Sequence, residues 1–231
     1  MKLFKLTEQD DTTYHKLTLW GENVTHKKIS KESPQLCSND VLHAYSNVNL
    51  AFLLNPIHAN IISPKLWEAA GEVVCEDFGK VGCFKLTTLR ELVIPAWVGS
   101  DKENSVRVMF AALCAESVLH VFEDKYPSDN RVREAIAAAK NYAQSPSTDA
   151  ARAAAAAAGW AEEADAARAA AAAGWAAAAA GWAAAAAAGW AAAAAGWAAA
   201  AGWAEEAASE TTFTIDFGSL ADTAISLITE K

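Results

Sequence analysis

The segment "AAAAAGWAAAAAGWAAAAAAGWAAAAAGWAAAAGWA", from Ala169 to Ala204, contains only alanine, glycine and tryptophan. Alanine has the highest helix propensity, whereas each glycine costs about 1 kcal/mol relative to alanine inside a helix. A small domain is roughly 30 Å wide, and one unbroken helix of this length would be longer than that. We therefore expect two or three packed helices, with some Gly-Trp pairs at turns and others inside helices.

The tryptophans of this region recur at helical spacing. At about 3.6 residues per turn, their six rings fall within roughly 140° of arc on an unbroken helix. Three alternatives follow. The rings could fill the core of an alanine-rich bundle, or they could line a cavity and stack on a flat ligand. The third alternative is that the region is a poorly packed low-complexity linker. The six positions are Trp160, Trp175, Trp182, Trp190, Trp197 and Trp203.

A membrane span is the other structure that an uncharged run of more than about 18 residues suggests. Alanine gains little from transfer into lipid. Glu162-Glu163 and Glu205-Glu206 flank the run, where a cytoplasmic anchor typically carries Lys or Arg. We therefore expect no membrane insertion.

The charge of the chain argues against nucleic acid as a partner. The net charge is −9, and from Asp149 onward 10 acidic residues face 3 basic ones. Duplex DNA is bound mainly through phosphate neutralisation by Lys and Arg, and the sequence contains no basic stripe. We expect no duplex nucleic acid partner, whereas a small anion held by two or three cationic side chains remains compatible with this charge.

The cysteines and histidines predict neither a metal site nor a cofactor. The spacing of the 4 cysteines and 5 histidines contains no CxxC and no HxxxH pattern, which zinc sites typically require. Unpaired cysteines in a chain of this size are typical of a reducing cytosol. The N-terminus lacks the apolar core of a signal peptide, so we expect a cytoplasmic location.

Short strand-like segments and turns alternate in the first part of the chain. Residues 2–7, "KLFKLT", have the alternation of a strand. Asn47 is placed to cap a short helix, and Pro56 is expected to end it. In "LWEAAGEVVCEDFGKVGCFKLTTLRELVIP" we expect strands broken at Gly79 and Gly82.

Helical spacing of apolar residues begins after a polar connector. Ser105 is a candidate N-cap for a helix that Pro127 ends, and Ser128 or Asp129 could cap the next one. A long alanine-rich region then follows. This order of elements predicts an α+β protein.

Three parts are expected within this α+β chain: a small mixed α/β domain at residues 1–98, an Ala/Trp-rich α-helical bundle at residues 105–208, and a tail at residues 209–231 that docks on the body. In the tail, the alternation over Phe213–Phe217 predicts a strand that Gly218 breaks, followed by a short amphipathic helix.

A pattern over residues 105–145 resembles the putative immunity protein family found beside bacterial toxins. The pattern is an Ala-Cys-Ala helix ending in Phe-Glu, followed by Pro-x-Asp-x-Arg-x-x-x-Ala-Ile and Ala-rich helices. The resemblance implies an all-helical bundle that covers residues 105–208. It rests on Cys114, Ala115, Phe122, Glu123, Pro127, Asp129, Arg131, Glu134, Ala135 and Ile136.

A second pattern, over residues 1–95, is similar to an uncharacterised domain of tailed-phage proteins. This resemblance implies a phage origin, and hence the cytoplasm of an infected bacterial host, but no established activity. The positions that carry it are Cys37, Asn39, His43, Tyr45, Trp67, Glu68, Gly71, Glu72, Arg90, Glu91 and Leu92.

The preferred function is non-enzymatic binding of a small nucleotide-like molecule, which sequesters a host anti-phage immune signal. Arginine forks and helix N-termini suit phosphate groups, and tryptophan rings stack on bases. Two candidate residues, His43 and Tyr45, are two apart and so share one side of a strand. The other candidates are Arg107, Arg131, Arg152, Arg168, Trp175, Trp182, Trp190 and Trp197.

Two other classes of function stay open. His43 and Tyr45 faintly resemble the pair that holds a nicotinamide nucleotide in ADP-ribosyltransferase-like folds, although no Glu stands out as the catalytic one. An antitoxin or immunity-type module would instead present the alanine–tryptophan face outward, as a homo-oligomer or against a partner protein. Motifs of P-loops, nucleophile elbows and zinc proteases are absent from the sequence.

Overall fold

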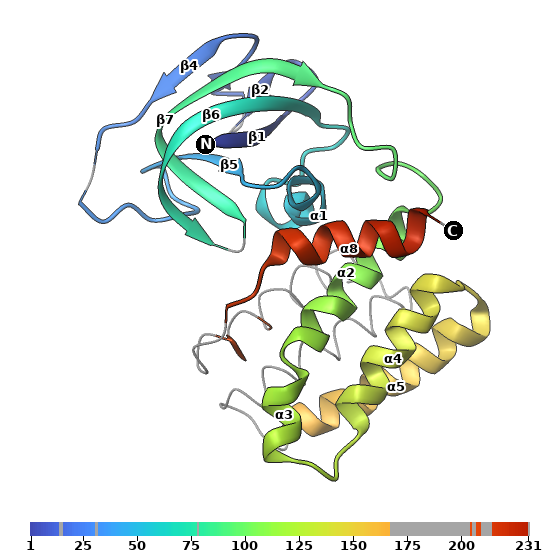
Figure 1. Ribbon diagram of the computed structural model, residues 1–231. Coiled ribbons are helices and arrows are strands. Elements are labelled where there is room, and N and C mark those ends of the chain that lie inside the picture. The colour runs from blue at the N-terminus through green and yellow to red at the C-terminus, as the bar shows by residue number, and fades with distance from the viewer. Residues whose placement is uncertain are drawn as a thin grey trace. The chain divides into compact units, whose positions relative to one another are not determined.

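The computed structural model describes residues 1–13, 16–30, 32–77, 79–166, 204, 207–208 and 214–230 (Figure 1). The chain divides into two compact units, Met1–Val98 and Gly99–Lys231. The first unit contains a five-stranded antiparallel sheet, and most of the helices lie in the second. The expected α+β class is therefore confirmed.

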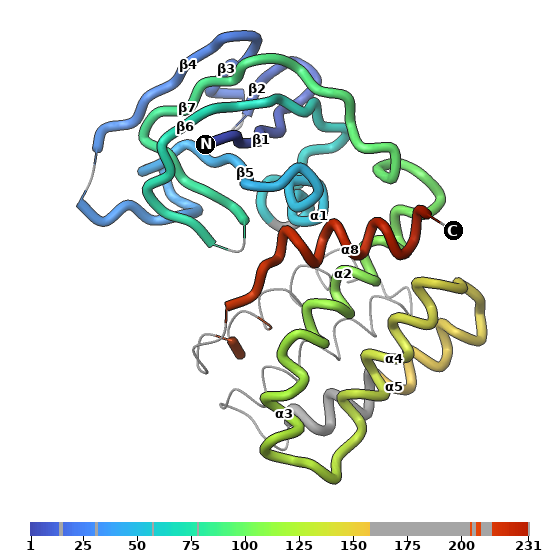
Figure 2. The backbone as a smooth tube through the Cα atoms, viewed as in Figure 1, coloured from blue at the N-terminus to red at the C-terminus, as the bar shows by residue number. Residues whose placement is uncertain are grey.

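The main sheet of the first unit closes on itself. Its strand order is β4-β7-β5-β1-β6, and β6 also pairs with β7, so that β7, β5, β1 and β6 form a ring (Figure 2). Two short strands, β2 (Thr12–Thr13) and β3 (Thr18–Leu19), form a separate pair. The strands of the main sheet are β1 (Lys2–Thr7), β4 (Val24–Lys27), β5 (Leu42–Tyr45), β6 (Lys65–Asp77) and β7 (Lys80–Leu92).

The hairpin of β6 and β7 is the longest pairing in the sheet. Gly79 has φ +89° in its turn, as the expected break there requires. The expected break at Gly82 is wrong, because Gly82 lies inside β7. A Cβ there would come within 2.7 Å of both Cys75 Sγ and Val41 Cγ2. Glycine is therefore needed for close packing rather than for a turn.

One apolar cluster fills the interior of the closed sheet. Its members on β5 alternate, as do Val81 and Cys83 on β7; a register shift in the β6–β7 pairing separates Cys83 from Leu86. The buried cluster comprises Leu3, Trp20, Leu42, Ala44, Ala69, Val81, Cys83 and Leu86.

Helix α1 (Val48–His58) follows β5 directly. The side chain of Asn47 accepts hydrogen bonds from the backbone N–H groups of Asn49 and Leu50, at 2.7 and 3.1 Å, which confirms the expected cap. The expected stop at Pro56 is wrong, because the helix continues to His58. Proline lacks the N–H that would bond to the carbonyl four residues earlier, and its ring crowds that carbonyl; only two residues of the helix follow Pro56, so little of the helix is affected.

Replacing Asn47 with Ala is expected to lower the free energy of unfolding by about 1 kcal/mol, because two N–H groups lose their acceptor. Asn47→Asp keeps an acceptor oxygen and is the matched control. Urea denaturation of the two variants and the wild type measures the difference. An alanine variant as stable as the aspartate variant would contradict the capping role.

The described helices of the second unit pack through small side chains. Helix α4 contacts both α2 and α5, and α8 contacts α2 and α4. Ala111, Ala112, Ala135 and Ala139 are fully buried, so neighbouring helices can approach closely. The helices are α2 (Glu103–Ser117), α3 (Leu119–Lys125), α4 (Arg131–Gln144), α5 (Thr148–Ala166) and α8 (Phe217–Thr229).

Two helix starts differ from the expectations. Helix α2 begins at Glu103, so Ser105 is not its cap but a buried residue of its first turn. The Glu103 carboxylate accepts from the N–H of Gly99 and pairs with Arg107, which stabilises the earlier start. Helix α4 begins at Arg131 with Asn130 as N-cap, whose side chain makes no capping bond; Asp129, one of the two expected residues, instead accepts from the N–H of Arg131 at 3.2 Å.

The expected strand at the end of the chain is wrong as far as the structure describes it. Residues 214–216 lie outside helices and strands, and Phe217 already belongs to α8. The side chain of Asp216 accepts a hydrogen bond from Ser219 N at 3.0 Å. This cap starts the helix, so Gly218 lies inside it and breaks nothing.

Within the part of the chain that the structure describes, no single helix has both the length and the apolar composition needed to cross a membrane. Only the bent pair of α2 and α3, taken together, meets that test.

Candidate functional site

Strand β5 carries both candidate residues of the first unit. Leu42 and Ala44 belong to the buried cluster inside the closed sheet. Because side chains alternate across a strand, His43 and Tyr45 share the opposite face. His43 is half-buried and Tyr45 is buried.

The hydroxyl of Tyr45 is hydrogen-bonded to Nδ1 of His58, the last residue of α1, at 3.1 Å. The two rings also stack, with centroids 5.8 Å apart and planes at 19°. Burial raises the pKa of the Tyr45 phenol. Burial, and then the charge of Lys80, lowers the pKa of His58 to about 4. Both groups are therefore neutral near pH 7.

His43 is held by two hydrogen bonds. The backbone N–H of Cys37 donates to its Nε2 at 3.1 Å, and Lys5 Nζ donates to its carbonyl oxygen at 2.8 Å. Burial, followed by the charges of Lys80, Lys5 and Lys28, lowers the pKa of the imidazole to about 4. Because Nε2 accepts, the neutral ring carries its proton on Nδ1.

Two buried lysines lie at this site. Lys80 is 6% exposed and Lys5 is 9% exposed. Lys80 Nζ donates to Cys37 Sγ at 3.0 Å, and Lys5 Nζ lies 5.0 Å from the ring centroid of Trp20. Burial and then the charge of Lys80 lower the pKa of Lys5 to about 8. Among the described residues, no ion pair joins a carboxylate to either ammonium group; Asp77, which lies opposite Lys80 in the β6–β7 hairpin, is exposed and makes no salt bridge with it.

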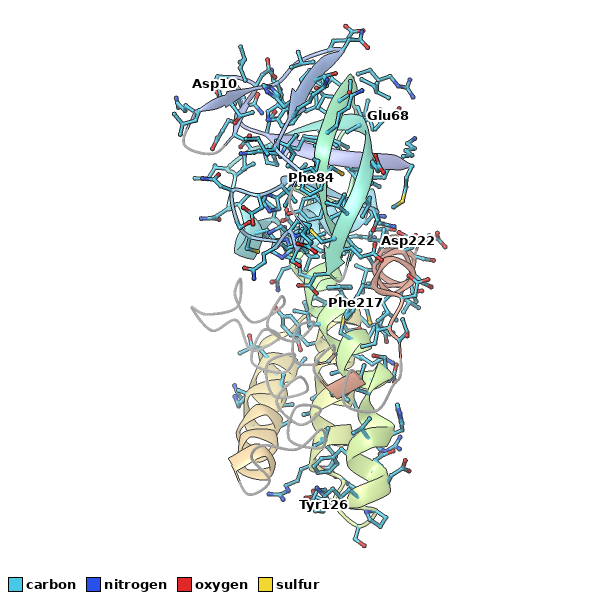
Figure 3. The ribbon with its side chains drawn as sticks, turned by 90° about the vertical axis from the view of Figure 1, so that its left-hand side faces the viewer. Asp10, Glu68, Phe84, Tyr126, Phe217 and Asp222 are labelled. Atoms are coloured by element: carbon cyan, nitrogen blue, oxygen red, sulfur yellow. The ribbon has the colours of Figure 1, made fainter. Side chains whose placement is uncertain are left out.

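The sheet register shows how these lysines reach β5. Tyr45 pairs with Lys80 on β7 and with Phe4 on β1. Lys80 therefore shares the face of Tyr45, whereas Lys5 comes from the opposite face. Lys28 lies beside β7, because its N–H donates to the carbonyl of Phe84, which Figure 3 labels, at 2.7 Å. Lys80 can contact a group bound beside His43, and the other two lysines add positive potential.

The second unit holds the candidate arginines of the described residues, each beside a carboxylate. Arg107 is buried and pairs with Glu103 at 2.6 Å, and Arg131 pairs with Asp129 at 2.7 Å. An anion would have to compete with those carboxylates. Arg152 is exposed and contacts Asp149 at 3.2 Å. The remaining candidates lie outside the described residues: Arg168, Trp175, Trp182, Trp190 and Trp197.

Lys5, Lys80 and Cys37 were not among the candidates from the sequence. Their separations from their partners, 38 residues for Lys5–His43 and 43 for Lys80–Cys37, leave no local signal. The described residues contain no group of three His, Cys, Asp or Glu side chains that could hold a metal ion.

Comparison with protein-family models, curated proteins and solved structures finds no match for this chain. The resemblances to immunity and tailed-phage proteins therefore stay predictions.

Proposed function

We propose that the protein binds a small nucleotide-like anion without acting as an enzyme, and that Lys80 and His43 form the contact for its anionic group. The observation that carries the proposal is the buried Lys80 ammonium, which among the described residues donates to a thiol and forms no ion pair, although Asp77 lies opposite it in the hairpin. Burying a charge without a counter-charge is costly. A phosphate oxygen would offset that cost through a charge-assisted hydrogen bond.

The local charge supports an anion although the chain as a whole is acidic. Lys80, Lys5 and Lys28 all lower the pKa of His43, so the imidazole experiences a net positive potential. Nδ1 of its neutral ring carries the proton and could donate it to an anionic oxygen. The site therefore combines positive potential with a neutral donor.

The biological setting that we propose follows from the resemblance of residues 1–95 to a domain of tailed-phage proteins. The protein would act in the cytoplasm of an infected bacterial host and sequester an immune signal. A cyclic nucleotide or an ADP-ribose derivative has the required phosphate and a flat base.

For the second unit we propose the Ala/Trp-rich helical bundle over residues 105–208, with tryptophan rings available for the base of the ligand. The packing of α2, α4 and α5 through buried alanines supports this part of the proposal. Base–aromatic stacking contributes about 1–3 kcal/mol per base.

The geometry supports binding better than it supports an ADP-ribosyltransferase-like reaction. Such a reaction would use the polar atoms of His43 and Tyr45 on a nicotinamide nucleotide. Nε2 of His43 already accepts from Cys37, and the Tyr45 hydroxyl is bonded to His58. No described contact favours an antitoxin-type module over a ligand-binding protein.

Calorimetric titration with a panel of pyrophosphate, ADP-ribose and cyclic dinucleotides tests the proposal. We expect at least one ligand to bind the wild type, and Lys80→Gln to weaken that binding about tenfold or more, because a hydrogen bond to a charged group contributes about 1.5–3 kcal/mol. Lys85→Gln, at an exposed position on the same strand, is the matched control and should bind as the wild type does.

Circular dichroism of each variant shows whether it remains folded. A flat titration of the wild type across the whole panel would rule out the proposed function. Equal binding by the wild type and a folded Lys80→Gln variant would show that the anion binds elsewhere in the protein.

A further inference from the structure

The contact between Lys80 and Cys37 brings an amine nitrogen to a sulfur atom in the N-terminal unit. Lys80 Nζ lies 3.0 Å from Cys37 Sγ. Lys80 is held at the start of β7 by its pairing with Tyr45. Cys37 has φ +60° and its N–H is bonded to His43. Backbone interactions on both sides therefore keep the two atoms together.

Cys37 is also the accessible cysteine of the chain. It is exposed, whereas Cys75 is half-buried and Cys83 and Cys114 are buried. Burial raises the pKa of the Cys83 thiol to about 11, and it raises the pKa values of Cys75 and Cys114 as well. Because the thiolate is the form that reacts with oxidants, these three thiols are protected and an oxidant from solvent meets Cys37 first.

We propose that Cys37 is the oxidation site of this protein, and that a peroxide converts the Cys37–Lys80 pair into a covalent sulfenamide cross-link. In the first step the sulfur of Cys37 attacks one oxygen of hydrogen peroxide, the O–O bond breaks, and the products are sulfenic acid and water. The sulfur is oxidised by two electrons and the peroxide is reduced.

In the second step Lys80 loses its extra proton to solvent and its lone pair attacks the sulfur of the sulfenic acid. The S–N bond forms, the S–O bond breaks, and the hydroxide leaves with a proton from the amine as a second water. Sulfenic acids condense with nitrogen in this way when a backbone amide is nearby. Here the side-chain nitrogen already lies in hydrogen-bond contact with the sulfur.

The cross-link removes an ammonium group from the face of His43. Oxidation would therefore release an anion bound at Lys80; this consequence rests on the proposed function. Formation of the cross-link itself does not depend on any ligand.

Peptide mapping by mass spectrometry tests the cross-link. The native protein is treated with hydrogen peroxide, blocked with iodoacetamide and digested. We expect the peptide of Cys37 joined to the peptide of Lys80, lighter by two hydrogen atoms than the two unmodified peptides together, and separated again by dithiothreitol. The same treatment in urea should lose the joined peptide, because only the fold holds nitrogen against sulfur.

Matched variants test whether Cys37 Sγ and Lys80 Nζ are the two atoms that the cross-link joins. Lys80→Arg retains the positive charge but lacks the amine, so the joined peptide should disappear. Lys28→Arg and Cys75→Ser should retain it. Either a joined peptide in Lys80→Arg, or wild-type Cys37 oxidised to sulfinic acid with Lys80 unmodified, would overturn the proposal. A joined peptide that contains an extra oxygen would show that the two side chains are not joined by a direct S–N bond. These outcomes are independent of nucleotide binding, so the two proposals fail separately.

Discussion

Gly82→Val is expected to destabilise the N-terminal unit by more than about 3 kcal/mol, because it combines overpacking with strain inside the sheet. A Cβ at this position lies 2.7 Å from both Cys75 Sγ and Val41 Cγ2, and 3.0 Å from Val41 Cβ. Val41 is itself buried and cannot move aside without displacing its neighbours. Urea denaturation monitored by hydrogen exchange of peptides from β5 and β7 measures the loss in this unit.

Two controls separate packing from backbone effects. Gly21 belongs to the same unit and has φ +158°, and a Cβ there would meet only Val24 Cγ2, at an ordinary contact distance of 3.5 Å, so Gly21→Ala should cost only the conformational strain, about 1–2 kcal/mol. Adding Val41→Ala and Cys75→Ala to Gly82→Ala removes the two nearest atoms and should recover part of its loss. If Gly82→Val cost no more than Gly21→Ala, the close packing around Gly82 would be disproved.

Lowering the pH from about 7 to about 5 is expected to reduce the unfolding free energy of the N-terminal unit by about 2 kcal/mol, by proton linkage. The pKa values of His43 and His58 fall from 6.5 to about 4 in the folded protein. Below pH 6.5, the pKa of these histidines in the unfolded chain, the unfolded chain binds protons that the folded protein does not bind. Stability is therefore complete above 6.5 and is lost progressively as the pH falls toward 4.

The size of this effect allows for solvent. Without solvent screening, the two pKa shifts would lower the free energy of unfolding by about 4 kcal/mol at pH 5. The rings are partly exposed, and we halve this free energy to allow for screening by solvent. The measurement is urea denaturation at several pH values with hydrogen exchange on β5. Stopping at pH 5 keeps most carboxylates ionised, so their titration contributes little.

Variants assign the pH effect to these rings. His43→Gln and His58→Gln together should flatten the dependence of stability on pH between 7 and 5. His120→Gln changes an exposed histidine of α3 in the other unit and should leave the N-terminal unit unaffected. A wild-type protein equally stable at both pH values would show that the rings are not held neutral by burial.

Local elements of the fold were predictable where one short segment contains the whole signal. Residues 2–7 have the alternation of β1, Asn47 has the side chain that caps α1, and Gly79 has the conformation that the β6–β7 turn needs. The expectations that failed also have local causes: Gly82 and Phe217 match the local patterns of a break and of a strand. Packing against Val41 and the cap at Asp216 overrode those patterns.

The candidate site was predictable only in part. The shared face of His43 and Tyr45 follows from their spacing on a strand. Their partners do not, because Lys5, Lys80 and Cys37 reach them through the β1–β5 and β5–β7 pairings and a loop. Cys37 belongs to the pattern of the tailed-phage resemblance, but no local feature of the sequence predicts that Lys5, Lys80 or Cys37 contacts its partner at this site.

The sequence by itself determined the α+β class, the helical character of the described alanine segments and the cap of α1, because propensity, periodicity and capping act over a few residues. Only the tertiary structure decided the ring closed by β6 and β7. It also decided the burial of two lysines without carboxylates and the contact of Lys80 with Cys37. Burial and charge at that site depend on strand pairings between residues far apart in the chain, and a local pattern does not encode them.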